Sequence, residues 1–190
     1  MKYCSACGNE VHLAVPEGDN RTRHVCAHCN TIHYSNPKIV TGCIVHWQNK
    51  VLLCRRAIEP RYGLWTVPAG FMENGETTYQ GAIRETLEEA NARVSSQKLY
   101  VLVNLPHIDQ VYMLFLAELA DLDFSPGEES LDVELFTEEE IPWNEMAFPT
   151  VSKSLELYFE DYRQGEFGMH ILDITLEDAE KRQFRIEKIQ

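Results

Sequence analysis

The stretch from Gly70 to Glu89, GFMENGETTYQGAIRETLEE, decides how this chain of 190 residues folds. Thr77 and Gln80 have the spacing of a capping box, in which each side chain accepts a hydrogen bond from the other residue's backbone N–H. We therefore expect a helix to begin at Thr77 and to run to Ala90.

The predicted helix carries an acidic face and an apolar face. Glu85, Glu88 and Glu89 are spaced i, i+3 and i+4, so we expect their carboxylates to converge within about one helical turn. Carboxylates this close repel one another unless a cation lies among them, and such hard oxygen ligands select Mg²⁺ or Mn²⁺ over zinc. The face expected to pack against a sheet holds Tyr79, Ala82, Ile83, Thr86, Leu87 and Ala90.

Two further helix residues bear on the acidic cluster. Gly81 lies one turn before the acids, and we expect its missing side chain to leave room for a ligand. Arg84 can pair with Glu88 and, through the preceding loop, with Glu76, which would hold the cluster in shape. A solvated acidic helix face is the common alternative, and the helix taken alone favours it.

Four of the six cysteines form two C-x-x-C pairs, Cys4 with Cys7 and Cys26 with Cys29. Each short loop directs two sulfurs at one ion, and this spacing is typical of a tetrahedral zinc site. A pair of redox motifs would need βαβ surroundings, for which residues 8–25 are too short and polar. Four cysteine ligands leave no open coordination position, so we expect the zinc to be structural.

The rest of the chain mixes strand-like and helical segments. Runs rich in β-branched residues predict strands at 39–47, 51–56, 64–67, 98–105, 111–119 and 132–136. A second helix is expected at 151–162. This mixture predicts an α/β fold, namely an α/β/α sandwich around a mixed sheet, preceded by a small zinc ribbon.

Three segments are expected along the chain. Asn36-Pro37 breaks the chain before the first long apolar run, which predicts a zinc ribbon at 1–35 and a larger domain at 36–176. The final segment, 177–190, is highly charged, and we expect a loosely attached tail.

A formal net charge of −13 narrows the classes of ligand. Duplex affinity comes largely from Lys and Arg, so the charge argues against a nucleic-acid partner. A divalent cation held by carboxylates would supply the positive charge that an anionic ligand needs. The sequence lacks both a long apolar run and the layout of a secretory signal, so we expect a soluble, cytoplasmic protein with no membrane partner.

The spacing of the whole segment, and not the helix alone, points to a family. It matches the Nudix box, G-x₅-E-x₇-R-E-U-x-E-E-x-G-U with U a bulky apolar residue, at Gly70, Glu76, Arg84, Glu85, Glu88 and Glu89. The chain therefore resembles the Nudix hydrolases, in particular the subgroup with an N-terminal zinc ribbon, from Cys4 to about Tyr158. In layout it is similar to the plant plastid pyrophosphatases of FAD and ADP-ribose.

The box is not matched throughout. Thr86 and Ala92 stand where the pattern has bulky apolar residues, and Asn91 replaces its last glycine. Asn tolerates the left-handed conformation expected after a helix, so the turn should survive. We expect the two small residues to affect packing more than chemistry.

The resemblance implies roles for the residues of the box. Glu85 and Glu89 would be the main Mg²⁺ (or Mn²⁺) ligands, with Glu88 and the Gly70 carbonyl completing the metal site. Arg84 and Glu76 would orient these acids.

The reaction implied by the resemblance is attack of water on one phosphorus of a P–O–P link. Mg²⁺ would neutralise the diphosphate and lower the pKa of the attacking water. The base that takes the proton would be either Glu88 or an acid in the later segment 125–130, and the sequence does not choose between them.

The same resemblance implies the substrate class and a homodimer. Enzymes of the subgroup split FAD into FMN and AMP, or ADP-ribose into AMP and ribose 5-phosphate. The residues expected to contact such a substrate are Arg56, Trp65, Tyr112 and Glu129. For Trp65, packing in the core is the alternative if its strand is central.

Two other functions remain open. NADH pyrophosphatases also join a zinc ribbon to this box, but they carry an S-Q-P-W-P-F-P-x-S motif, and residues 104–110 read NLPHIDQ here. A Nudix domain can also lose catalysis and serve as a nucleotide sensor or nucleic-acid-binding module. The intact acids and the negative charge speak against that module.

Overall fold

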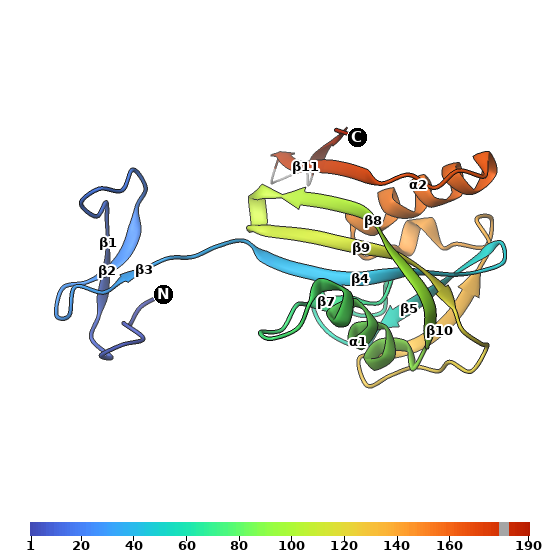
Figure 1. Cartoon of the computed structure of the whole chain (residues 1–190), viewed down its shortest axis with the longest axis horizontal. Helices are drawn as coiled ribbons and strands as arrows, with labels where there is room; N and C mark the ends of the chain where they lie inside the picture. Colours follow the sequence, from blue (N-terminus) through green and yellow to red (C-terminus); the bar gives the residue numbers. More distant parts are fainter. Residues whose placement is uncertain (179–182) are drawn as a thin grey trace. The chain divides into compact units, whose positions relative to one another are not determined.

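The computed structural model describes all residues except 179–182, and it divides into two compact units, Met1–Pro37 and Lys38–Gln190 (Figure 1). Part of the tail predicted at 177–190 therefore lies outside the described residues. None of the helices that the structure describes has the length and apolar character needed to span a membrane.

The first unit is a small antiparallel sheet with the strand order β1-β2-β3. Its strands are β1 (Val11–Ala14), β2 (Arg23–Cys26) and β3 (Ile32–His33). Gly8 and Asn30 follow the two cysteine pairs with positive φ angles of 74° and 57°. This left-handed backbone, which Gly and Asn adopt at low cost, turns the chain back after each pair.

The second unit is built on one mixed sheet with the strand order β10-β5-β4-β9-β8-β11-β12, with β6 paired to β5 and β7 paired to β4. The β4–β9 and β8–β11 pairs are parallel, and the others are antiparallel. The strands are β4 (Lys38–Trp47), β5 (Lys50–Arg56), β6 (Trp65–Thr66), β7 (Ala69–Phe71), β8 (Val94–Leu105), β9 (Gln110–Leu119), β10 (Ser130–Phe136), β11 (His170–Asp178) and β12 (Gln183–Lys188). The helical elements are α1 (Thr78–Ala90), α2 (Pro149–Gln164) and the 3₁₀ turns Pro106–Ile108 and Trp143–Glu145.

Each face of this sheet carries its own core, because successive residues of a strand point to opposite faces. On β5, Val51 and Leu53 pack in the core that contains Leu155 of α2, whereas Leu52 packs in the core that contains Ala82 of α1. The two helices thus cover opposite faces. This arrangement confirms the predicted α/β/α sandwich.

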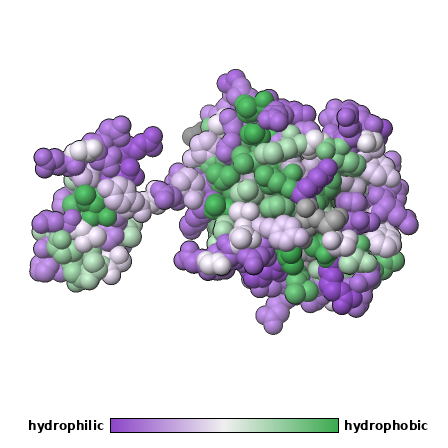
Figure 2. Space-filling view, in the orientation of Figure 1, coloured by the Kyte–Doolittle hydropathy of each residue, from purple (hydrophilic) through white to green (hydrophobic). Residues whose placement is uncertain are grey.

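The structure confirms the start of α1 and corrects the prediction of which face is buried. Thr77 caps the helix, and the reciprocal hydrogen bonds with Gln80 complete the predicted capping box. The residues of α1 that are buried are Gly81, Ala82, Glu85, Thr86, Glu89 and Ala90. Tyr79 and Leu87, expected in the core, are instead 44% and 49% exposed. Apolar residues are also visible among the polar residues on the face of this unit that Figure 2 shows.

Small side chains explain this rotation of the helix. A Cβ at Gly81 would lie 2.6 Å from the Thr41 methyl group on β4 and 2.7 Å from a carboxylate oxygen of Glu76. At Gly81, α1 therefore lies too close to β4 for a large side chain to fit between them. Thr41 and Glu76 fill the space beside Gly81. The prediction that this glycine leaves room for a ligand is therefore wrong.

The C-terminal segment is part of the sheet in the residues that the structure describes. β12 pairs antiparallel with β11, and β11 pairs parallel with β8. The prediction of a loosely attached tail is therefore wrong for 183–188. An edge strand carries charged residues at its exposed positions, as a disordered tail does. The charged composition of this segment therefore could not distinguish the two.

A buried polar network fixes β11 to α2 and β8. The hydroxyl of Tyr100 donates to Oδ2 of Asp161 at 2.9 Å, and Nε2 of His170 lies 2.8 Å from the same oxygen. The three residues belong to three elements and are all buried. Burial raises the pKa of Tyr100 well above its usual value, so this phenol keeps its proton and remains a donor.

We predict that Asp161→Ala lowers the free energy of unfolding by about 3 kcal/mol, because it leaves two buried donors without their acceptor. Urea denaturation followed by circular dichroism measures this loss. Glu160→Ala is the matched control, since Glu160 is exposed on the same helix, and its effect should stay within about 0.5 kcal/mol. Equal losses in the two variants would contradict the network's role.

Candidate functional site

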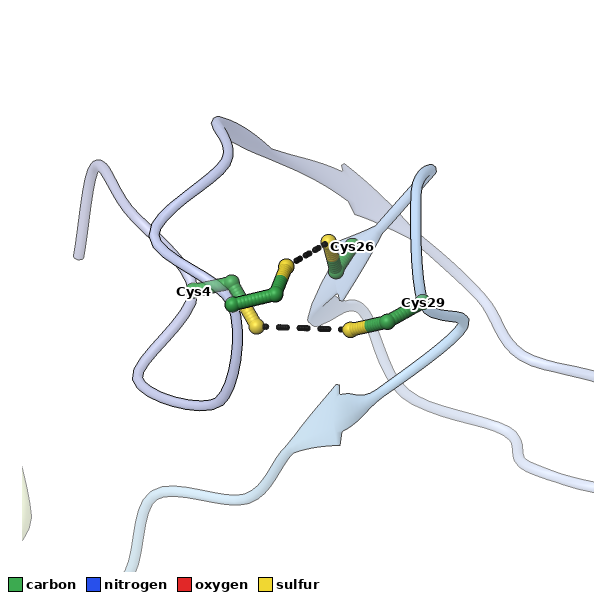
Figure 3. Close-up of side chains that lie close together, drawn as sticks. Cys4, Cys26 and Cys29 are labelled. Atoms are coloured by element: carbon green, nitrogen blue, oxygen red, sulfur yellow. Dashed lines mark hydrogen bonds between the residues drawn. The ribbon is translucent and has the colours of Figure 1, made fainter.

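The two C-x-x-C pairs come together in the first unit (Figure 3). The Sγ atoms of Cys4 and Cys29 lie 3.6 Å apart, and those of Cys7 and Cys26 lie 3.5 Å apart. A tetrahedral zinc ion with Zn–S bonds of about 2.3 Å would hold its sulfurs about 3.8 Å apart. Thr31 lowers the pKa of Cys29 to about 6 through its hydrogen bond, which favours the thiolate that binds metal. These residues fit the predicted structural Zn²⁺.

In the second unit, the inward side of α1 borders a large cavity of about 1260 Å³. Its acidic wall consists of Glu85, Glu88 and Glu89 from α1 together with Glu128 and Glu129 from the segment before β10. Other described residues lining the cavity, from six further parts of the unit, include Arg56, Gly70, His107, Tyr112, Phe148 and Phe184.

Arg84 holds the acids and the loop before α1 in place. Its guanidinium donates five hydrogen bonds, two to Glu76 (2.8 and 3.1 Å), one each to Glu85 (2.7 Å) and Glu88 (2.9 Å), and one to the carbonyl of Phe71 (3.2 Å). The predicted pairings with Glu76 and Glu88 are therefore present. Arg84 also lowers the pKa of Glu76 to about 2, so this carboxylate stays ionised.

Glu85 and Glu89 are the buried members of the cluster, at 9% and 7% exposure. Burial, together with repulsion from Glu85, raises the pKa of Glu89 to about 8, although Arg56 and the Ala69 backbone act in the opposite direction. Burial also raises the pKa of Glu85. Two neighbouring buried carboxylates with too little positive charge around them fit a cation of charge two or more.

Gly70 is required beside this pair. A Cβ at Gly70 would lie 2.4 Å from the carboxylate of Glu85. The backbone of β7 and this carboxylate can approach so closely only because residue 70 has no side chain. The backbone at Gly70 thus lies directly against one of the two buried acids.

Glu88 is the exposed member of the cluster. Its side chain is 58% exposed and is paired with Arg84, although it lines the same cavity as the buried pair. In the part of the chain that the structure describes, the four cysteines each place one ligand atom within 4.8 Å of the others, as a metal site requires. The three glutamates do not. The three carboxylates therefore line one cavity but do not form a single metal-type cluster in this conformation, in which Arg84 bridges Glu85 and Glu88.

The segment 125–129 completes the acidic wall through contacts that the sequence does not reveal. The N–H of Gly127 donates to the carbonyl of Glu89 at 3.0 Å, and a Cβ at Gly127 would lie 1.7 Å from the carbonyl oxygen of Glu88. Asn91 adopts the predicted left-handed conformation, with φ of 47°, and its side chain donates to the carbonyls of Ser125 and Pro126. These contacts place Glu129 close enough to raise the pKa of Glu85 and Glu89.

The residues predicted to contact substrate divide into two groups. Arg56 and Tyr112 line the cavity with Glu129. Arg56 lies with its guanidinium 5.4 Å from the ring centroid of Phe148. Trp65 lies in the core at 7% exposure, with its ring edge-on to Phe136, so we do not retain it as a substrate-binding residue.

Family models match both units. The Nudix N-terminal model matches residues 2–35, and the NUDIX domain model matches residues 36–158. The chain belongs to the Nudix family. This confirms the resemblance and the presence of the N-terminal zinc ribbon. Nudix enzymes use divalent ions such as Mg²⁺ or Mn²⁺, and the oxygen donors at Gly70, Glu85 and Glu89 suit such ions.

Several curated Nudix relatives are NAD-capped RNA hydrolases. The NudC protein of Photorhabdus laumondii is 33% identical over 129 residues, which are 67% of this chain and 46% of the relative. The NudC protein of Vibrio atlanticus is 33% identical over 147 residues, 75% of this chain and 51% of the relative. The chain thus spans about half the length of the curated relatives that it matches.

Solved Nudix structures are also similar. A NUDIX hydrolase from Nitrosomonas europaea has a TM-score of 0.89 and 59% identity, covering 92% of this chain and 99% of that one. An ADP-ribose pyrophosphatase from Streptococcus suis has a TM-score of 0.59 and 21% identity, covering 72% of this chain and 99% of that one. The second likeness shows a shared fold.

We predict that the purified chain contains one zinc ion per molecule and that Cys26→Ser lowers this content severalfold, because a buried sulfur ligand is lost. Mass spectrometry of the metal content measures it. His28→Ala, within the same C-x-x-C pair but exposed, should retain the zinc. Full zinc content in Cys26→Ser would show that the metal is held elsewhere.

Proposed function

We propose that this Nudix protein hydrolyses the diphosphate link of FAD or ADP-ribose and releases AMP in a reaction that requires Mg²⁺ or Mn²⁺. The observation that carries the proposal is the buried pair Glu85 and Glu89, which lies with Gly70 on the wall of a cavity large enough for a dinucleotide. Buried carboxylates with raised pKa values in a concave site are typical of catalytic centres.

The metal ligands in this proposal are Glu85, Glu89 and the carbonyl of Gly70. Glu88 would join them by turning away from Arg84, which its exposure permits. When bound, the cation would neutralise charge on the diphosphate. Arg84 would keep its bonds to Glu76, so the loop before α1 would stay in place during this change.

The remaining lining residues would orient the substrate. Arg56 lines the cavity and donates to the carbonyl of Pro60 at 3.0 Å, and it forms no salt bridge with any described residue, so its guanidinium can still bind a phosphate. Tyr112 would offer a ring face or its hydroxyl to the nucleoside. Its pKa is raised by burial, so the hydroxyl stays protonated and can donate.

For the general base we favour Glu129 over Glu88. Glu88 accepts a hydrogen bond from Arg84 at 2.9 Å, and in this proposal it would turn to bind the metal, so its carboxylate has another partner in either position. The side chain of Glu129 accepts no hydrogen bond from any described residue, and it faces the same cavity. A carboxylate that is free at the cavity wall is better suited to take a proton from water.

NAD-linked compounds are the second candidate substrates. The NudC relatives act on NAD-capped RNA, which favours NADH or an NAD-linked cap over FAD. The absence of the S-Q-P-W-P-F-P-x-S motif from residues 104–110 and beyond favours FAD or ADP-ribose instead. All of these compounds contain an AMP half joined through a diphosphate, so the proposed reaction is the same for each. We also propose a homodimer, on the family resemblance.

AMP release from FAD, ADP-ribose, NADH and a nucleoside triphosphate, each with and without Mg²⁺, tests the function and selects the substrate. We predict metal-dependent release from FAD or ADP-ribose, with Glu89→Gln lowering kcat/KM at least about 100-fold because a cation ligand is lost. Glu166→Gln, an exposed change outside the cavity, should leave the rate unchanged. If no substrate turns over while RNA binds with a steep salt dependence, the chain is a binding module.

Gly70→Ala tests the metal ligands without removing a charge. The new Cβ would displace the Glu85 carboxylate, so we predict that the affinity for Mn²⁺, measured by electron paramagnetic resonance, falls about tenfold or more. Gly168→Ala is the control, because a Cβ there would meet no atom within 4 Å. Unchanged Mn²⁺ affinity in Gly70→Ala would argue that the ion binds away from Glu85.

A further inference from the structure

A second groove lies next to the cavity. This groove has a volume of about 790 Å³. Arg61, Pro149 and Phe184 line both spaces. A substrate whose diphosphate lies beside Glu85 and Glu89 can therefore extend past Phe184 into the groove.

The charge of the groove is opposite to that of the chain. Its lining includes three cations, Arg61, Lys153 and Lys188, and among its described residues one acid, Glu156. Lys153 is paired with Glu156 at 2.9 Å. Arg61 and Lys188 form no ion pair with any described residue. In a protein with a formal net charge of −13, two free cations at one groove favour an anionic ligand there.

Alternate side chains of β12 point to the same face of the strand, and Lys188 lies on the face that lines the groove. Phe184, Ile186 and Lys188 line the groove, whereas Arg185 and Glu187 pair with each other on the other face of the strand. The family model ends at residue 158, so this strand lies outside the part that matches the NUDIX domain. The other residues that line the groove lie within 36–158, so β12 adds one wall to a groove that the matched domain begins.

We infer that the groove binds a phosphate group carried on the ribose of the substrate's adenosine half, beyond the diphosphate that is cleaved. Arg61 and Lys188 donate charged hydrogen bonds to this phosphate, and Phe184 packs against the nucleoside between the two anionic groups. The first turn of α2 borders the same place, and its N-cap residue Phe148 has no side-chain acceptor, so the helix adds partial positive charge. This inference rests on the proposed function, because it assumes an adenosine diphosphate compound in the cavity.

Calorimetric titration of the full chain, with Mg²⁺ present, tests the inference without turnover. The probes are 5′-AMP, adenosine 2′,5′-bisphosphate and adenosine 3′,5′-bisphosphate. We predict that one bisphosphate binds about tenfold more tightly than 5′-AMP, and the better isomer identifies the position of the phosphate. Lys188→Ala should remove most of this difference.

Arg185→Ala is the matched control, because it removes the same charge from the same strand on the opposite face. It should preserve the preference for the bisphosphate. Equal affinity of all three probes for the unmodified chain would overturn the inference, and so would equal losses in Lys188→Ala and Arg185→Ala, which would indicate a general effect of charge.

Turnover separates the inference from the proposed function. ADP-ribose and ADP-ribose 2′-phosphate should both release their nucleotide product, with kcat/KM about tenfold higher for the phosphorylated substrate if the 2′ isomer is preferred. Turnover of ADP-ribose with no preference for a bisphosphate would overturn the inference that the groove binds phosphate, and it would still support the proposed function. A bisphosphate preference without turnover of any substrate would refute the function and keep the groove as an anion site.

Discussion

The candidate site depends on the guanidinium of Arg84. It bonds to Glu76 and Phe71 in the loop before α1 and to Glu85 and Glu88 on the helix itself. One planar group with five donors can hold a loop and a helix in register, which a lysine could not do. The backbone of β7 therefore meets the buried acids of α1 in a fixed arrangement before any ion or substrate binds, and the exposed Glu88 is the acid that would still have to turn.

The same helix shows how small residues make a site. Gly81 and the row of Ala82 and Thr86 allow α1 to lie close to the sheet, and this turns Glu85 and Glu89 inward while apolar side chains face solvent. Burying two carboxylates together destabilises a fold unless a cation compensates. The burial of Glu85 and Glu89 is therefore explained by the binding of a cation, and this is the physical reason to propose that the functional site is here.

Local patterns in the sequence predicted much of this. The C-x-x-C pairs, the capping box at Thr77 and the Arg84–Glu76 pairing depend on short separations or on a long fixed motif. The burial of Glu85 and Glu89 could not be predicted from a helical wheel, because it is set by the approach of β4. The docking of Gly127 on α1 and the pairing of β12 depend on contacts between distant segments, and no local pattern encodes these.

The most direct test of the account is a crystal structure of the chain with Mn²⁺ and a non-hydrolysable α,β-methylene analogue of ADP-ribose. We predict anomalous density for Mn²⁺ between Glu85, Glu89 and the carbonyl of Gly70, in contact with the diphosphate analogue. Mn²⁺ bound away from these residues, with Glu85 and Glu89 still free of metal, would contradict the account.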